Sequence, residues 1–102
     1  MSYKGSKYFT TLNKRKIRYL LVEKNSPIVV VFFHGFMSDM VGIKPTTIQK
    51  FCKKQKLNFL KFEYSGHGRS SGKFIDGNIS KWTSEAKQLI RSKIKKDKNL
   101  IF

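Results

Sequence analysis

The sequence has little cysteine, little negative charge and no long apolar run, and each shortage excludes a class of protein. The single cysteine, Cys52, cannot form an internal disulfide bond, which is typical of a reducing compartment. The longest apolar run, 28–33, has six residues, whereas a membrane-spanning helix needs about 20. The first seven residues carry charges with no apolar stretch behind them, unlike a secretory signal peptide. We therefore expect a cytoplasmic protein without a membrane span.

The length and composition limit the chain to one domain or part of one. It has 102 residues, of which 39% are hydrophobic and 27% are charged. This apolar content is too high for a fully disordered chain. We expect residues 1–102 to form a single partial domain, with no cofactor and no bound metal.

The charge is strongly positive, because 22 lysines and arginines stand against six acidic residues, giving +16. Basic residues cluster at 14–16, 53–54 and 93–98, but no nucleic-acid-binding motif accompanies them. Most are lysines, whereas base recognition favours arginine. The charge therefore predicts a solvated surface without specific nucleic-acid binding. An alternative function is that of a non-catalytic basic fragment that binds polyanions weakly.

The first half of the chain has the composition of β-strands. Residues 7–12 and 16–23 are rich in β-branched and aromatic side chains and flank the polar turn 13–15, which predicts a hairpin. Residues 28–33 are apolar at every position. Such a run predicts a strand that is buried on both faces, as in the middle of a parallel sheet.

Helical and strand-like patterns alternate in the rest of the chain. Pro45 suits the first turn of a helix, and this helix would present Ile48, Phe51, Cys52 and Gln55 on one face. Residues 57–64 are strand-like, and 65–78 form a loop rich in glycine and serine. A second helix, capped by Asn78 or Ser80, has an apolar stripe made of Ile79, Trp82, Ala86, Leu89, Ile90 and Ile94. Residues 99–102 predict the start of another buried strand.

This order of elements predicts the α/β class, in which right-handed crossovers build a mostly parallel sheet with helices on its faces. Open α/β sheets bind ligands beyond the carboxyl ends of their strands. The loops 34–44 and 65–78 are therefore the places to look for a functional site.

Three separated motifs resemble one family. They are His34-Gly35-Phe36-Met37-Ser38-Asp39-Met40, then Tyr64-Ser65-Gly66-His67-Gly68-Arg69-Ser70-Ser71-Gly72, and finally the segment from Asp76 to Trp82. In order and spacing they resemble the N-terminal half of the α/β-hydrolase superfamily, over residues 10–102. The finer resemblance is to the group that contains the acyl-glucuronide esterase and palmitoyl-protein thioesterase, with its bacterial relatives.

The resemblance implies roles for six residues. The backbone N–H of Phe36 would form half of an oxyanion hole, which stabilises the negative oxygen of a tetrahedral intermediate. His34 and Gly35 would support this loop, the histidine by hydrogen bonding and the glycine by permitting a tight turn. The second loop would shape the pocket through Gly66, His67 and Gly68.

Two other side chains, Ser70 and Cys52, are weaker candidates for a catalytic nucleophile. Residues 68–72 match the Gly-x-Ser-x-Gly pattern of a nucleophile elbow around Ser70, but the elbow requires a strand directly before the serine and a helix directly after it. Neither is predicted there. Cys52 lies on the apolar face of its helix, which indicates a small core residue.

The chain departs from the family where catalysis would begin. By resemblance, the nucleophile elbow follows the strand at 99–102, and the triad acid, the triad histidine and the second oxyanion donor follow later. We therefore expect a truncated or split serine hydrolase that is inactive alone. A second chain with the C-terminal half would have to complete it before it could act on an acyl ester or thioester. The resemblance also places the strand at 99–102 beside 28–33.

Overall fold

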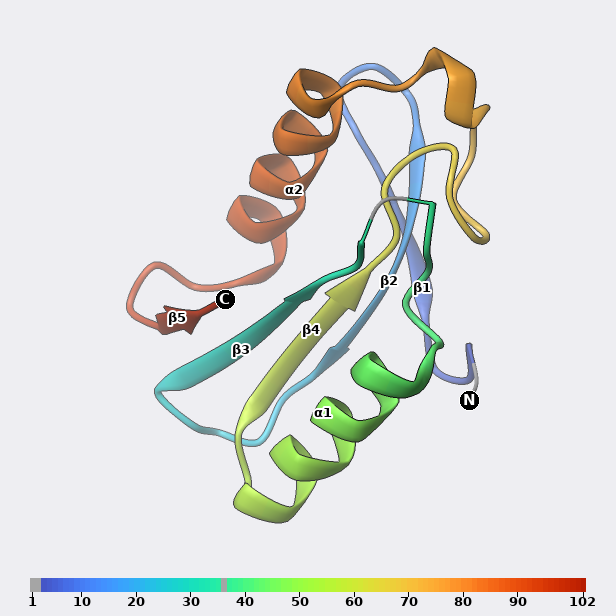
Figure 1. Ribbon diagram of the computed structural model, residues 1–102. Helices are drawn as coiled ribbons and strands as arrows, with labels where there is room; N and C mark the ends of the chain where they lie inside the picture. Colours follow the sequence, from blue (N-terminus) through green and yellow to red (C-terminus); the bar gives the residue numbers. More distant parts are fainter. Residues whose placement is uncertain (1–2, 36) are drawn as a thin grey trace.

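The computed structural model describes residues 3–35 and 37–102, which form one mixed sheet with a helix on each face (Figure 1). The five strands lie in the order β1-β2-β4-β3-β5. Their bounds are Lys7–Thr10, Lys16–Val22, Asn58–Phe62, Ile28–Phe33 and Asn99–Ile101, in that spatial order. Two neighbouring pairs, β3 with β4 and β3 with β5, are parallel, whereas β1–β2 and β2–β4 are antiparallel.

The hairpin and both helices form where the sequence predicts them. The hairpin closes when Thr11 donates its N–H to the carbonyl of Arg15. Helix α1 spans Ile43–Gln55, with Pro45 in its first turn. Helix α2 spans Ile79–Lys93, and the side chain of Asn78 caps it by accepting the N–H of Lys81. Of the two proposed caps, the structure therefore selects Asn78.

The main core lies between the sheet and α2. Ala86 and Leu89 of α2 pack against alternate strand residues, and the buried part of this core contains Ile17, Tyr19, Val29, Val31, Leu60 and Phe62. The alternation follows from the pleat, which turns successive side chains to opposite faces. The apolar stripe of α2 is thus confirmed as a core stripe, except at Ile79, which is 70% exposed.

Two expectations about strand burial are wrong in part. Only one face of β3 is deeply buried, at Val29 and Val31, because α1 covers the neighbouring strand β4 instead. All five residues of β4 are buried, since it lies in the middle of the sheet with α1 on one face and α2 on the other. Strand β5 does pair with β3 as expected, but it is an exposed edge strand rather than a buried one.

Candidate functional site

The loops that follow β3 and β4 meet beyond the carboxyl ends of these parallel strands. Two histidines join them in opposite directions. His34, just after β3, accepts the N–H of Tyr64 at Nε2 over 3.1 Å. His67, in the loop after β4, accepts the N–H of Met37 at Nε2 over 3.2 Å. Each loop is therefore held by the imidazole of the other.

Both imidazoles are neutral in this arrangement. Because each Nε2 accepts a backbone N–H, the ring proton sits on Nδ1. The Nδ1 atoms face carbonyl oxygens, that of Gly35 for His34 at 2.6 Å and that of Ser65 for His67 at 3.1 Å. Burial lowers the pKa of His34 from its ordinary value of 6.5, the Gly35 carbonyl opposes this, and His67 lowers it further.

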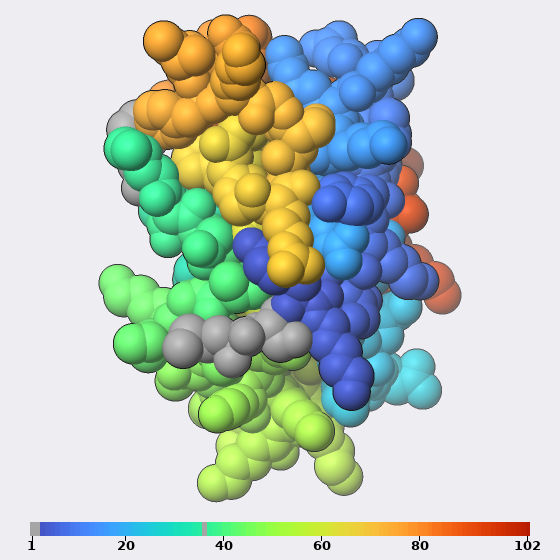
Figure 2. Space-filling view, turned by 90° about the vertical axis from the view of Figure 1, so that its right-hand side faces the viewer, coloured from blue at the N-terminus to red at the C-terminus, as the bar shows by residue number. Residues whose placement is uncertain are grey.

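Glu63 is a fully buried carboxylate that holds both loops through hydrogen bonds. It accepts the hydroxyl of Tyr3, the N–H of Met40 over 3.2 Å and the N–H of Arg69 over 2.8 Å. The guanidinium of Arg69 also stacks on the ring of Tyr3, 4.1 Å from its centre. Figure 2 shows the N-terminal segment (dark blue) lying against this loop (yellow). Glu63 therefore connects three segments that are far apart in sequence.

Glu85 of α2 also connects distant segments of the chain through its carboxylate. Its carboxylate is buried and accepts both the N–H and the hydroxyl of Ser65. It also forms an ion pair of 3.4 Å with Arg15 of the hairpin turn. The indole N–H of Trp82 donates to the carbonyl of the same serine over 3.1 Å. The start of the second loop is thus fixed to the helix.

One signal in the sequence could have located these two buried carboxylates. Only six residues of the chain are acidic, and Glu85 falls three residues after Trp82 and one before Ala86, on the apolar face of its helix. Glu63 follows directly after β4. An acidic residue at a core position implies a hydrogen-bonded role, because an unpaired buried charge is costly.

The glycines of the second loop are needed for different reasons. Gly66 and Gly68 both have positive φ, +76° and +48°. A Cβ at Gly68 would lie 2.0 Å from Oε2 of Glu63, and one at Gly66 would lie 2.7 Å from the backbone N of Phe74. By contrast, Gly35 has no positive φ, and a Cβ there would meet nothing within 4 Å. Contrary to the expectation, the turn therefore does not depend on the conformational freedom of Gly35. The positive φ is found at Met37 instead.

Ser70 lies within the loop rather than on an elbow. It is 9% exposed, its hydroxyl donates to the carbonyl of Glu63 over 2.6 Å, and it accepts the N–H of Arg18. In the part of the chain that the structure describes, β4 ends at Phe62, well before Ser70, and the first helical segment after Ser70 is the short 3-10 turn Phe74–Asp76. Cys52 is 1% exposed on α1, and burial raises the pKa of its thiol. Both residues occupy structural positions.

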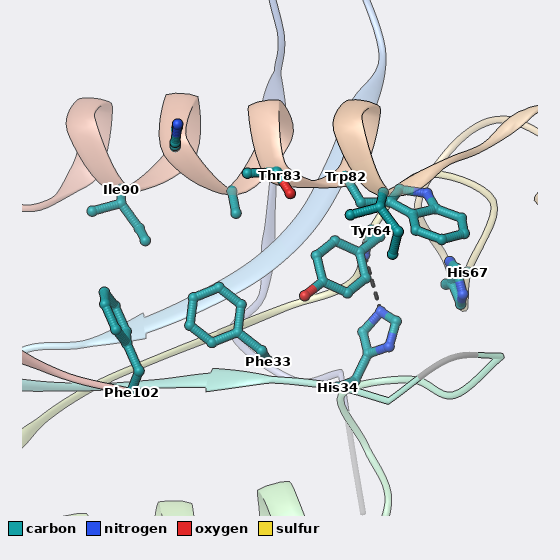
Figure 3. A pocket seen from close by; sticks show the side chains of 11 residues that line it. Phe33, His34, Tyr64, His67, Trp82, Thr83, Ile90 and Phe102 are labelled. Atoms are coloured by element: carbon teal, nitrogen blue, oxygen red, sulfur yellow. Dashed lines mark hydrogen bonds between the residues drawn. The ribbon is translucent and has the colours of Figure 1, made fainter.

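An apolar cavity of about 510 Å³ opens between α2 and the ends of β3 and β4 (Figure 3). Aromatic rings form much of its wall, and the two histidines lie at one end of it, where the His67 ring is 5.1 Å from that of Trp82. The lining residues are Phe33, His34, Tyr64, His67, Ile79, Trp82, Thr83, Ala86, Lys87, Ile90 and Phe102.

The site residues named from the sequence are only partly gathered at this cavity. His34 and His67 line it, whereas Gly35, Gly66 and Gly68 do not. Phe36, the expected oxyanion donor, lies outside the described residues, so its role stays a prediction. Within residues 3–35 and 37–102, no three His, Cys, Asp or Glu side chains are grouped to hold a metal ion. None of the helices described is long and apolar enough to cross a membrane.

Comparison with known proteins identifies the fold. No protein-family model matches the chain. It is 33% identical over 61 residues to "Palmitoyl-protein thioesterase ABHD10, mitochondrial" from Mus musculus, a match that covers 60% of this chain and 20% of that protein. The Homo sapiens protein of the same name matches equally. Since these relatives are named as mitochondrial, a cytoplasmic location stays a prediction.

Solved structures agree over most of the chain. A putative hydrolase from Agrobacterium vitis S4 superposes with a TM-score of 0.79 at 28% identity, covering 85% of this chain and 35% of that one. The mouse alpha/beta hydrolase domain-containing protein 10 gives 0.80 at 23%, covering 88% and 36%. Est1E from Butyrivibrio proteoclasticus, solved with ferulic acid, gives 0.79 at 21%, covering 92% and 40%.

These comparisons confirm the resemblance that the motifs predicted. The chain has the fold of part of an α/β-hydrolase, and it spans about a fifth of the curated relatives and 35–40% of these solved chains. The portion is therefore closer to a third of such an enzyme than to the half that the sequence suggested.

Proposed function

We propose that this chain is the N-terminal portion of a serine hydrolase of acyl esters or thioesters, and that it supplies the oxyanion loop but no nucleophile. The observation that carries the proposal is that His34 and His67 each hydrogen-bond the other's loop and that both line one apolar cavity. The curated relatives named as thioesterases support the substrate class.

These hydrogen bonds between the loops would preorganise the oxyanion donor. An oxyanion donor stabilises the transition state only if its N–H is already fixed where the negative charge develops. His67 holds the N–H of Met37, and His34 contacts the carbonyl of Gly35. The residues on both sides of Phe36 are thus anchored, which supports the proposal that its N–H acts as an oxyanion donor.

The hydrogen bonds also support catalytic silence of the chain alone. A serine nucleophile needs a base with a free lone pair. The Nε2 lone pair of each histidine already accepts a backbone N–H. The hydroxyls of Ser65 and Ser70 donate to Glu85 and to the carbonyl of Glu63 instead. These groups act as structural links, so the nucleophile and base must come from elsewhere.

The test is a chimera in which residues 1–102 replace the matching portion of the Agrobacterium vitis hydrolase. The chimera should hydrolyse a p-nitrophenyl acyl ester and react with a fluorophosphonate probe, whereas the isolated chain should do neither. In the chimera, Phe36→Pro removes the proposed N–H donor and should lower kcat about 10²–10³-fold. Phe36→Leu keeps the N–H and is the matched control.

Two outcomes would contradict the proposal. One is a folded chimera in which Phe36→Pro and Phe36→Leu have equal kcat at unchanged melting temperature. The other is ester hydrolysis by the isolated chain that disappears in Ser70→Ala, since this would make Ser70 a nucleophile.

A second candidate function is weak, non-catalytic binding of polyanions. Of the six acidic residues, Glu63 and Glu85 are buried within hydrogen-bonded networks, so the surface is even more basic than the net charge of +16 indicates. Such a surface attracts phosphate backbones through counterion release, without sequence preference.

A further inference from the structure

Helix α1 contacts the sheet on one side only. It lies against β4, and its buried residues are Pro45 and Cys52. Because a helix turns by about 100° per residue, the side chains about half a turn away from these two point out of the fold. All of them are exposed, and they form the outer face of α1: Ile43, Lys44, Thr47, Lys50, Phe51 and Lys54. None of the other helices and strands described lies over this face (Figure 1).

Two large apolar side chains on the outer face remain in water. Ile43 is 75% exposed and Phe51 is 56% exposed. The expectation that Phe51 shares the buried face of Cys52 is therefore wrong, because the one position between them turns the side chain out of the interface with the sheet. Neither side chain belongs to the core of the fold. The outer face thus has an apolar component that the fold itself does not use.

The same helix is strongly basic. Its exposed lysines, with the one that follows it directly, are Lys44, Lys50, Lys53, Lys54 and Lys56. Residues 40–62 contain no acidic side chain. Of the two carboxylates that flank this stretch, that of Asp39 accepts the N–H of Val41 over 3.0 Å, and that of Glu63 is fully buried. Among the described residues, no carboxylate forms an ion pair with these lysines.

Helix stability does not account for this arrangement. Lys53 and Lys54 lie in the last turn, where positive charge favours the helix dipole. Lys44, however, lies in the first turn, where a positive charge opposes the dipole and no acidic residue compensates it. Exposure of Ile43 and Phe51 likewise gives the fold nothing. A partner that is both negatively charged and apolar would account for both features.

We propose that the outer face of α1 docks on an anionic lipid bilayer. A bilayer presents negative headgroups directly above an apolar layer, so it can take up Phe51 and Ile43 while the lysine side chains reach back to the headgroups. Four to eight basic residues on one helix are typical of binding to anionic lipids. A nucleic acid offers the phosphates without the apolar layer, and a second copy of this chain repels the first through its charge of +16. The proposal is independent of the hydrolase function, since binding requires no catalysis.

Co-sedimentation of the full chain with phosphatidylcholine vesicles, with and without phosphatidylserine, tests the docking. Binding should require phosphatidylserine, and it should weaken as the salt concentration rises, because salt screens exposed charges. Absence of binding to the vesicles that contain phosphatidylserine would overturn the proposal.

Two pairs of lysines separate the outer face from the net charge. Lys50→Gln combined with Lys54→Gln removes two charges from the outer face. Lys95→Gln combined with Lys96→Gln removes two charges from exposed positions after α2 and is the matched control. The first pair should weaken vesicle binding about 10–30-fold, and the second less than about 3-fold. Equal losses would show that net charge alone attracts the chain, and would overturn the proposal. If the first pair weakens binding of DNA but not of vesicles, the partner is a nucleic acid instead.

Two phenylalanines test the apolar part of the contact. Phe51→Ser should weaken vesicle binding about 10-fold, because the side chain no longer enters the apolar layer. Phe102, which follows β5 and is 73% exposed, gives the matched control, and Phe102→Ser should change binding less than about 2-fold. In Phe51→Trp, lipids brominated on their acyl chains should quench the added indole, whereas they should leave Trp82, 6% exposed on α2, unquenched in the unsubstituted chain. Equal effects of the two serine variants, or no quenching in Phe51→Trp, would contradict insertion of this face.

Discussion

Substitution of Gly68 by alanine should be unusually damaging for an exposed loop residue. Two effects add. The residue has a φ of +48°, where an L side chain costs about 1–2 kcal/mol. Its Cβ would also lie 2.0 Å from Oε2 and 2.2 Å from Cδ of Glu63, which is fully buried.

The size of the second effect follows from the hydrogen bonds of Glu63. If the carboxylate moves away, it loses at least one of the bonds from Tyr3, Met40 and Arg69. Each bond to a charged group contributes about 1.5–3 kcal/mol. The free energy of unfolding of Gly68→Ala should therefore fall by about 3 kcal/mol or more, a large fraction of the usual total of about 5–15 kcal/mol.

Two other glycines separate the contributions. Gly72 has a φ of +92°, but a Cβ there would have its nearest neighbour at 3.7 Å, so Gly72→Ala should cost only the backbone strain of about 1–2 kcal/mol. Gly35 has neither a positive φ nor a neighbour within 4 Å. Gly35→Ala should therefore stay within about 0.5 kcal/mol of the unsubstituted chain.

Urea unfolding followed by the fluorescence of Trp82 measures this series. Trp82 is the only tryptophan, is 6% exposed, and donates to the carbonyl of Ser65 at the start of the same loop. The expected order of stability is Gly35→Ala, then Gly72→Ala, then Gly68→Ala. Equal midpoints for Gly68→Ala and Gly72→Ala would show that Glu63 gives way at no cost, and would refute the reasoning.

Three further predictions concern single groups. His34 is neutral and its pKa is lowered by burial, so the unfolded chain binds more protons and stability should fall as the pH drops below about 6.5; His34→Gln should flatten this part of the urea midpoint against pH. The buried thiol of Cys52, whose pKa is raised by burial, should react with a disulfide reagent far more slowly in the native chain than in urea, and equal rates would place it on the surface. Binding of DNA should be weak, with a Kd of about 10⁻⁴–10⁻⁶ M at physiological salt, and should be equal for two unrelated sequences; discrimination between them at 150 mM salt would contradict this.

The kind and order of the helices and strands could be predicted from local patterns in the chain. Alternation and helical periodicity are local patterns, and they located the hairpin, the strand 28–33 and both helices. The motifs around His34 and His67 also indicated two loops that meet in the structure, because loops beyond neighbouring parallel strands lie at one edge of the sheet. The place of β5 beside β3 came from the resemblance, since nothing local sets the order of strands.

The contacts that join these two loops, by contrast, could not be predicted from local patterns. The hydrogen bonds of His34 and His67 each join residues 30 positions apart, and that of Tyr3 to Glu63 joins residues 60 apart. No periodicity records which distant N–H a side chain will meet. Burial of Glu63 and the open edge of β5 likewise depend on which elements cover which face of the sheet. These are properties of long-range packing, whereas sequence patterns report how each segment folds against its own neighbours.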